Sequence, residues 1–255
     1  MCYDDNARPP NPPGTKEAAR GEDIVLTAAD GNRFLAYAAH PEQPARAQVV
    51  IFPDARGLQQ FYKELALRFA EIGIEAVALD YYGRTAGLTA RDDTFDFMPH
   101  LIQQQQPQEA AWQGFYADRA AAFAYLQAGT GKERATFTIG FCMGGTISFL
   151  TATTDLGVAG AIGFYAPPIN NNEGSFLDRA EHIKHPVLGL FGDADRVISV
   201  SEAQAFDERL DKAGVEHEII IYPGAPHGFF ELQKVEYASD AWQRVLGFIN
   251  AHTPT

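Results

Sequence analysis

One short segment limits the possible folds of this chain more than any other. Residues 140–145 read GFCMGG, and they stand between a β-type apolar run and a second apolar run. A sharp turn from a strand into a helix requires small residues around its central position, because larger side chains would collide there. The segment therefore predicts a strand, a tight turn centred on Cys142, and a helix.

The place of Cys142 in this turn indicates chemistry. Its sulfur would lie at the amino end of the helix, where free N–H groups and the positive end of the helix dipole favour a thiolate and can bind an oxyanion. The alternative is a buried cysteine in a glycine-rich turn, which is common for this residue type. The motif alone leaves both interpretations open.

The rest of the chain alternates between strand and helix periodicity. A hairpin is expected first, with strands over 22–28 and 33–39 on either side of Asp30-Gly31-Asn32. Further strands are expected over 47–52, 75–80, 135–140, 158–164, 186–192 and 216–224, and helices over 59–73, 107–129, from about 144, over 201–214 and over 234–251. This order predicts an α/β fold in which an eight-stranded, mostly parallel sheet is covered by helices on both faces.

Length and composition predict one folded domain. A chain of 255 residues with 46% hydrophobic side chains can bury a full core. Residues 1–21 are rich in Pro and form an expected extended or disordered arm, which leaves 22–255 as a single domain. Residues 81–108 interrupt the pattern after the fourth strand, and they are either a wall of the binding cleft or a solvated loop.

Charge and residue spacing disfavour several classes of function. With 20 basic against 33 acidic residues, the formal charge of −13 makes nucleic acid and anionic lipid improbable partners. No apolar run reaches the roughly 18 residues of a membrane span and no secretory signal is visible, so we expect a cytoplasmic protein. Cys2 and Cys142 are the two cysteines, and no zinc-type or nucleotide-binding motif occurs. We therefore expect neither a metal nor a cofactor.

A nucleophile at Cys142 requires an acid and a histidine further along the chain, in that order and after later strands. Asp193 and Asp195 follow the seventh expected strand, and His227 lies in a loop after the eighth. We take Asp195 as the acid, because the turn from Gly192 would aim it toward the histidine, whereas Asp193 is suited to capping the turn. Cys142, Asp195 and His227 follow expected strands in separate segments, in the order that a catalytic triad requires. This agreement favours a catalytic role over the alternative, in which the aspartates only form a turn and the histidine is a surface residue.

With these residues identified, the sequence resembles the dienelactone hydrolase family of α/β-hydrolases over about residues 22–250. The motifs that carry the resemblance are GFCMGG at 140–145, FGDADRVIS at 191–199 and PHGFF at 226–230. The resemblance implies the α/β-hydrolase fold and a catalytic triad of Cys142, Asp195 and His227.

Further site residues are implied by the resemblance alone. Asp54, in the loop after the third strand, would hold the resting thiol at a position where the family usually has the longer Glu. Arg84 would bind a substrate carboxylate, with a solvated loop charge as the alternative, and the family's second Arg for that carboxylate corresponds to Glu231 here. The backbone N–H groups of Ala55 and Met143 would bind the oxyanion.

The expected function is that of a hydrolase that cleaves lactones or activated carboxylic esters through a thioester acyl-enzyme. Its expected partner is a small-molecule ester or lactone. Tyr82 and Phe229 are candidate substrate-binding residues, and packing in the core is their alternative. Two other functions stay open: a broad-specificity carboxylesterase or thioesterase that does not act on dienelactone, and a non-catalytic binding protein on the same fold.

Overall fold

The computed structural model describes residues 3–14, 16–105, 109–128, 134–168 and 175–254, so Cys2 lies outside the described residues. Within these ranges eight strands form one sheet in the order β1-β2-β4-β3-β5-β6-β7-β8. β1 pairs antiparallel with β2, and β2 with β4, whereas every later pair across the sheet is parallel. The sheet is mixed and mostly parallel, which confirms the predicted architecture.

The strands and helices lie close to their expected positions. The strands are β1 Ala19–Thr27, β2 Arg33–Pro41, β3 Ala47–Phe52, β4 Ile74–Leu79, β5 Thr136–Phe141, β6 Val158–Phe164, β7 Val187–Gly192 and β8 His217–Tyr222. The helices are α1 Gln60–Ala70, α2 Gly83–Ala86, α3 Met98–Gln105, α4 Glu109–Ala128, α5 Met143–Thr151, α6 Val200–Ala213 and α7 Val235–Ala251, with a 3₁₀ turn at Ala180–His182. The insertion at 81–108 contains α2 and α3, and its residues 106–108 lie outside the described part.

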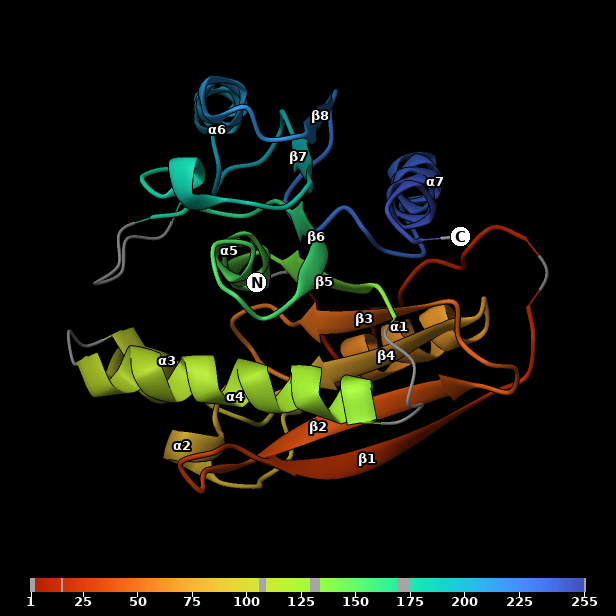
Figure 1. Cartoon of the computed structure of the whole chain (residues 1–255), viewed down its shortest axis with the longest axis vertical. Coiled ribbons are helices and arrows are strands. Elements are labelled where there is room, and N and C mark those ends of the chain that lie inside the picture. Colours follow the sequence, from red (N-terminus) through yellow and green to blue (C-terminus); the bar gives the residue numbers. More distant parts are fainter. Residues whose placement is uncertain (1–2, 15, 106–108, 129–133, 169–174, 255) are drawn as a thin grey trace.

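Strand periodicity sorts the core side chains onto two faces of the sheet. In β3, Val49 belongs to a buried cluster with Phe61 of α1, and the next residue, Val50, belongs to a second cluster with Phe123 of α4. Figure 1 shows α7 on one side of strands β6 to β8 and α5 and α6 on the other. Helices therefore cover both faces, and the long apolar strands are buried between them.

The fold brings four loops to one edge of the sheet. β3, β5, β7 and β8 run parallel, so their carboxyl ends point the same way. The loops that follow these strands carry Asp54, Cys142, Asp195 and His227. Residues far apart in the sequence can thus form one site.

The described residues of the amino-terminal arm pack against the rest of the chain, and β1 begins at Ala19, within the range 1–21 that was assigned to the arm. Tyr3 is 3% exposed, and its ring stacks on Phe61 with centroids 3.7 Å apart. Further along the arm, Trp242 Nε1 donates to the Pro10 carbonyl at 3.0 Å. Arm residues therefore contribute to the buried core, although the Pro-rich composition of the arm predicts no buried residues.

Candidate active site

Cys142 occupies the tight turn between β5 and α5. Its φ of 54° and ψ of −119° form a conformation that costs a non-glycine residue free energy, and its N–H donates to the Phe164 carbonyl at 3.0 Å. A Cβ at Gly140 would lie 1.9 Å from the Gly144 carbonyl oxygen, and one at Gly144 would lie 2.1 Å from the Phe52 carbonyl oxygen. The turn therefore requires these glycines, and it presents the cysteine at the amino end of α5.

His227 lies between Asp195 and Cys142. Its Nδ1 is 2.7 Å from Asp195 Oδ2, and its side chain is 13% exposed. Burial opposes the charged imidazolium, but hydrogen bonds with Asp195 and Cys142 outweigh that effect and raise the pKa of His227 to about 9. At neutral pH the ring therefore carries a proton on each nitrogen, with Nδ1 facing Asp195 and Nε2 left for Cys142.

The two acidic residues after β7 have different partners. Asp195 Oδ1 accepts from the Val197 N–H at 2.7 Å, and although burial acts to raise the pKa of Asp195, the bonds from His227 and the backbone lower it below its usual value. Asp193 Oδ1 instead accepts from the Gly224 N–H at 2.6 Å, which ties the end of β7 to the loop after β8. The structure thus brings Asp195 to the histidine and gives Asp193 a role in the turn.

Asp54 lies in the loop after β3. The residue is 2% exposed, and its Oδ1 accepts from the Arg56 N–H at 2.9 Å. Burial first, and then nearby negative charges that include Asp54 and Cys142, raise the pKa of Tyr81 well above its usual value. The charges of Asp54 and Cys142 thus both act on the Tyr81 hydroxyl.

The candidate oxyanion donors are the backbone N–H groups of Ala55 and Met143. Met143 is the first residue of α5, so its N–H points out of the helix end. The Tyr82 hydroxyl donates to the Ala55 carbonyl, and the Tyr81 hydroxyl donates to the Pro53 carbonyl at 2.7 Å. Two tyrosines at the end of β4 thus fix the loop that carries Ala55.

The two aromatic residues expected to bind substrate are fully buried. Tyr82 supports the Ala55 loop, as described, and Phe229 packs edge-on against Tyr165 with ring centroids 5.3 Å apart. The centroids of the Tyr165 and His227 rings are in turn 4.8 Å apart. For both Tyr82 and Phe229 the structure favours the packing alternative, because side chains without exposed surface offer none to a ligand.

Arg84, in α2, is held by acidic residues. Its Nη1 donates to Asp30 Oδ2 at 2.7 Å, its Nη2 donates to Asp118 Oδ1 and to the Gly114 carbonyl, each at 2.7 Å, and its Nε donates to Asp118 Oδ2 at 3.0 Å. These bonds join the β1–β2 turn to α4. A substrate carboxylate would have to displace two aspartates, so the structure gives no support to the substrate-binding role implied for Arg84.

Glu231 also has a charged neighbour. Its Oε2 lies 3.3 Å from Lys234 Nζ, and its side chain is 19% exposed. The position that corresponds to the family's second Arg therefore carries a carboxylate paired with a lysine.

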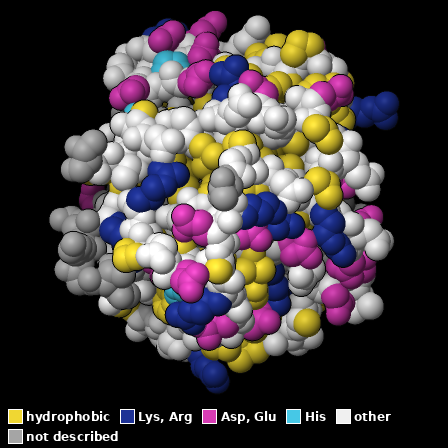
Figure 2. All heavy atoms as spheres, turned by 90° about the vertical axis from the view of Figure 1, so that its right-hand side faces the viewer, with side chains coloured by type: hydrophobic (Ala, Val, Ile, Leu, Met, Phe, Trp, Pro, Cys, Tyr) yellow, Lys and Arg dark blue, Asp and Glu magenta, His cyan; other side chains and the backbone are white. Residues whose placement is uncertain are grey.

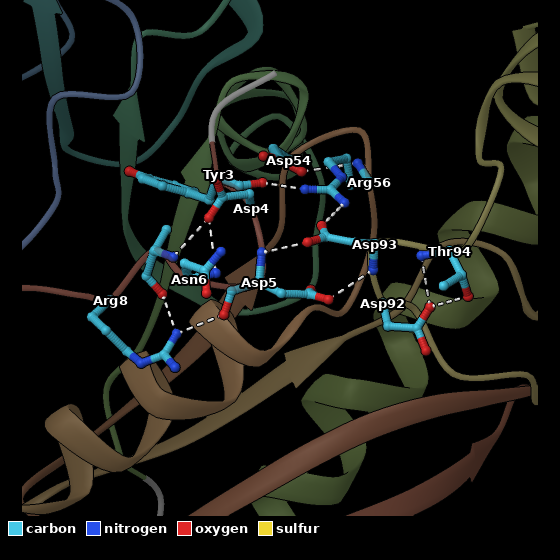
Figure 3. Close-up of polar contacts among 11 residues, drawn as sticks. Tyr3, Asp4, Asp5, Asn6, Arg8, Asp54, Arg56, Asp92, Asp93 and Thr94 are labelled. Atoms are coloured by element: carbon cyan, nitrogen blue, oxygen red, sulfur yellow. Dashed lines mark hydrogen bonds and ion pairs between the residues drawn. The ribbon is translucent and has the colours of Figure 1, made fainter.

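Tyr3 is a residue beside the site that sequence reasoning missed. Its hydroxyl shares a hydrogen bond with the Tyr165 hydroxyl and donates to the Phe230 carbonyl at 2.9 Å, and its own carbonyl accepts from Arg56 Nη1. Figure 3 shows Tyr3 beside Asp54 and Arg56. An isolated tyrosine in a Pro-rich arm has no periodicity to mark it as buried, so no local signal would have identified it.

Basic and acidic side chains are interspersed on the face of the molecule shown in Figure 2, and they do not gather there into one basic area. Among the residues that the structure describes, no group of three or more His, Cys, Asp or Glu could hold a metal ion. Within the same residues, no helix is both long enough and apolar enough to cross a membrane.

Known proteins are similar in sequence to this chain over most of its length. A model of the dienelactone hydrolase family matches residues 34–253. A "putative carboxymethylenebutenolidase" from Yersinia pestis is 27% identical over 233 residues, which cover 87% of this chain and 85% of that protein. A "probable 2-oxo-3-(5-oxofuran-2-ylidene)propanoate lactonase" from a Bradyrhizobium species is 27% identical over 246 residues, which cover 90% and 94%.

Solved structures share the fold. A "putative dienelactone hydrolase" from Klebsiella pneumoniae superposes with a TM-score of 0.77 at 24% identity, covering 92% of this chain and 99% of that one. A dienelactone hydrolase-like promiscuous phosphotriesterase from metagenomic libraries gives a TM-score of 0.76 at 21% identity, covering 93% and 100%. The eight-stranded sheet and its helices therefore form the α/β-hydrolase fold.

Proposed function

Because this chain belongs to the dienelactone hydrolase family, we propose that it hydrolyses lactones or activated carboxylic esters with Cys142, His227 and Asp195 as its triad. It is a carboxymethylenebutenolidase-like hydrolase by distant homology. The observation that carries the proposed triad is the position of His227, which has Asp195 Oδ2 2.7 Å from Nδ1 and also interacts with Cys142. A non-catalytic binding protein on this fold would need neither this arrangement nor the strained turn at Cys142.

The first half of the reaction forms a thioester. In the resting site His227 has already taken the thiol proton, and the Cys142 thiolate attacks the carbonyl carbon of the ester or lactone. The N–H groups of Ala55 and Met143 receive the oxyanion, an interaction worth about 2.7–4 kcal/mol per donor in other enzymes. As the C–O bond breaks, the imidazolium gives its Nε2 proton to the departing oxygen, and the acyl group stays on sulfur.

The second half of the reaction releases the acyl group. Acylation removes the negative charge on Cys142, which is one of the causes that raise the pKa of His227, so that pKa falls in the acyl-enzyme. The neutral imidazole then accepts a proton from water as the water oxygen attacks the thioester carbonyl. The C–S bond breaks, the acid product leaves, and the thiolate–imidazolium pair forms again.

The leaving group of the substrate and the charges on the protein both limit which substrates are favoured. A thiolate is itself a good leaving group, so substrates whose own leaving group is an enolate, a phenolate or a protonated alkoxide are favoured over amides. Arg84 is held by Asp30 and Asp118, and Glu231 is paired with Lys234. These contacts favour neutral esters and lactones, and with them the broad-specificity carboxylesterase as the second candidate function.

The proposal is tested by replacing the cysteine. We expect Cys142→Ala to lower the hydrolysis of 4-nitrophenyl acetate by at least about 10³-fold, because the nucleophile is lost. Iodoacetamide should inactivate the wild-type protein and label Cys142. Cys2→Ala, which removes the other cysteine, serves as the matched control and should stay active and sensitive to iodoacetamide. A folded Cys142→Ala variant with wild-type turnover would rule out the mechanism.

A second pair of variants tests the choice of acid. Asp195→Asn should lower kcat by on the order of 10²–10⁴-fold, because the carboxylate that orients and stabilises the imidazolium is lost. Asp193→Asn should have a much smaller effect, since Asp193 bonds the Gly224 N–H and not His227. The measurement is kcat for both variants under the same conditions, and equal losses would contradict the assignment of Asp195.

A further inference from the structure

The arm brings a buried tyrosine to the carboxyl edge of the sheet. The Tyr3 ring stacks on Phe61 with an interplanar angle of 10°, and it meets Phe141 edge-on with ring centroids 6.4 Å apart. Phe141 directly precedes Cys142 in the sequence. A residue from the far amino-terminal end of the described chain is therefore packed beside the candidate nucleophile turn.

The Tyr3 hydroxyl is bonded to the segment that carries the histidine and to a ring that lies against it. It donates to the Phe230 carbonyl at 2.9 Å, and Phe230 follows closely after His227. Because a phenol has a single proton, the Tyr165 hydroxyl is the donor in its bond with Tyr3. The Tyr165 ring lies 4.8 Å from the imidazole ring. One hydroxyl thus contacts a ring that lies against the imidazole and the backbone of the segment that carries it.

Tyr165 has a backbone conformation that needs support. Its φ of 37° lies in the left-handed region, which is unfavourable for a side chain of this size. Its N–H donates to the Leu190 carbonyl at 2.7 Å, which fixes the backbone end of the residue. The bond to Tyr3 fixes the hydroxyl end, and the ring between them is held against His227.

The arm has anchors other than the Tyr3 hydroxyl. The Asp5 N–H donates to Asp93 Oδ2 at 3.2 Å, and the Asp93 N–H donates to Asp5 Oδ2 at 2.9 Å, as Figure 3 shows. Arg56 is hydrogen-bonded to both the Tyr3 carbonyl and the Asp93 carboxylate. A change that removes only the hydroxyl of Tyr3 therefore leaves the arm attached.

We propose that Tyr3 is a positioning residue for His227: its hydroxyl fixes Tyr165 and the Phe230 carbonyl, and through them the imidazole relative to Cys142. The inference rests on the proposed function of His227 as the proton carrier for Cys142. It extends the catalytic machinery to the amino-terminal arm, which otherwise carries no recognisable motif.

Tyr3→Phe is the direct test, because it keeps the ring on Phe61 and removes the hydroxyl. The variant loses two hydrogen bonds, one with the Tyr165 hydroxyl and one to the Phe230 carbonyl. With 4-nitrophenyl acetate we expect kcat to fall about three- to tenfold and KM to change by less than about twofold. Tyr165→Phe, which removes only the bond that the two hydroxyls share, should lower kcat by the same factor or less. The double variant should be no slower than Tyr3→Phe, because Tyr3→Phe already removes the shared bond.

Tyr222→Phe is the matched control. Tyr222 is also a buried tyrosine, and its hydroxyl donates to the Asp240 carboxylate at 2.7 Å, so this variant too loses a phenol hydroxyl that is hydrogen-bonded within the fold. Its kcat should stay within about twofold of wild type, although its Tm should fall about as much as that of Tyr3→Phe. Equal kcat losses in the two variants would show a general effect on stability and overturn the positioning role, as would a wild-type kcat for Tyr3→Phe.

A measurement that uses no ester can test the role of Tyr3 independently of the proposed function. The rate at which iodoacetamide alkylates Cys142 at pH 7 depends on the contact with His227, and we expect Tyr3→Phe to slow it by about the same factor as kcat. A wild-type protein that hydrolyses no ester would contradict the proposed function, and the alkylation rates would still test Tyr3. Equal alkylation rates in wild type and Tyr3→Phe would overturn the inference in either case.

Discussion

At the scale of single residues, the proposed mechanism makes the rate depend on the proton of His227 and on the leaving group. Asp195 and Cys142 raise the pKa of His227 to about 9, so the imidazolium is present below that pH and is lost above it. An alkoxide leaving group needs this proton, whereas a 4-nitrophenolate leaves without it. The same histidine should therefore give different pH profiles with different substrates.

We expect kcat/KM for an alkyl ester or a saturated lactone to fall as the pH rises through about 9, where His227 loses its proton. For 4-nitrophenyl acetate, kcat/KM should stay level or rise over the same range, because only the thiolate is needed for acylation. The measurement is kcat/KM between pH 6 and 10.5, on the order of ten points per substrate. Parallel high-pH decreases for both substrates would contradict a proton donated by His227.

Some residues of the site could be predicted from the sequence, and the partners of others could not. Cys142, Asp195 and His227 are each marked by a local motif after a strand, and parallel strands bring such positions to one edge. The partners of Arg84 carry no such mark, because Asp30 and Asp118 come from the hairpin turn and from α4. Contacts between side chains from separate elements depend on packing, which a single sequence does not encode in its local pattern.

At the scale of elements, the β5–turn–α5 unit is tightly constrained. Gly144 has the Phe52 carbonyl where a Cβ would be, so β3 approaches α5 too closely for any side chain there. Gly247, within α7, has no atom within 4 Å of the position of a Cβ. Two helical glycines thus differ entirely in what an added methyl group would meet.

We expect Gly144→Ala to destabilise the protein by at least about 2 kcal/mol, because the methyl group would overlap backbone that cannot move aside cheaply. Gly247→Ala is the matched control, and it should stabilise the protein by about 0.5–1 kcal/mol, since alanine is the better residue in an exposed helix interior. Urea unfolding of both variants and of wild type measures the free energies. A Gly144→Ala variant as stable as wild type would contradict the close approach of β3 and α5.

Elements with strong periodicity could be predicted nearly to the residue. β3 at Ala47–Phe52 and β6 at Val158–Phe164 have the expected bounds, because buried parallel strands are continuous apolar runs between clear turn signals. The insertion at 81–108 was expected to be irregular and contains α2 and α3, which are too short to show a helical period. Such short helices depend on tertiary contacts, so the hydrophobic periodicity of the sequence could not predict them.

At the scale of the whole molecule, charge bears on which substrates are favoured. The formal charge of −13 gives the protein a field that repels anions at long range, and salt weakens that field, with a screening length of about 10 Å at 0.1 M ionic strength. A cation at the site could offset the repulsion locally, but Arg84 is engaged by two aspartates and Glu231 adds a carboxylate next to Lys234. Anionic substrates should therefore be disfavoured both at a distance and at the site.

The effect of charge can be measured with two matched esters, 4-nitrophenyl butyrate and the mono-4-nitrophenyl ester of glutaric acid. We expect kcat/KM for the neutral ester to equal or exceed that for the acid, and added salt to raise kcat/KM for the acid alone, because screening acts only on the charged substrate. Glu231→Arg should shift the preference toward the acid. Glu208→Arg, which makes the same charge change on an exposed position of α6, should shift it much less. A wild-type preference for the acid of about tenfold or more, equivalent to about 1.4 kcal/mol, would contradict the argument and indicate a carboxylate-binding site in this protein.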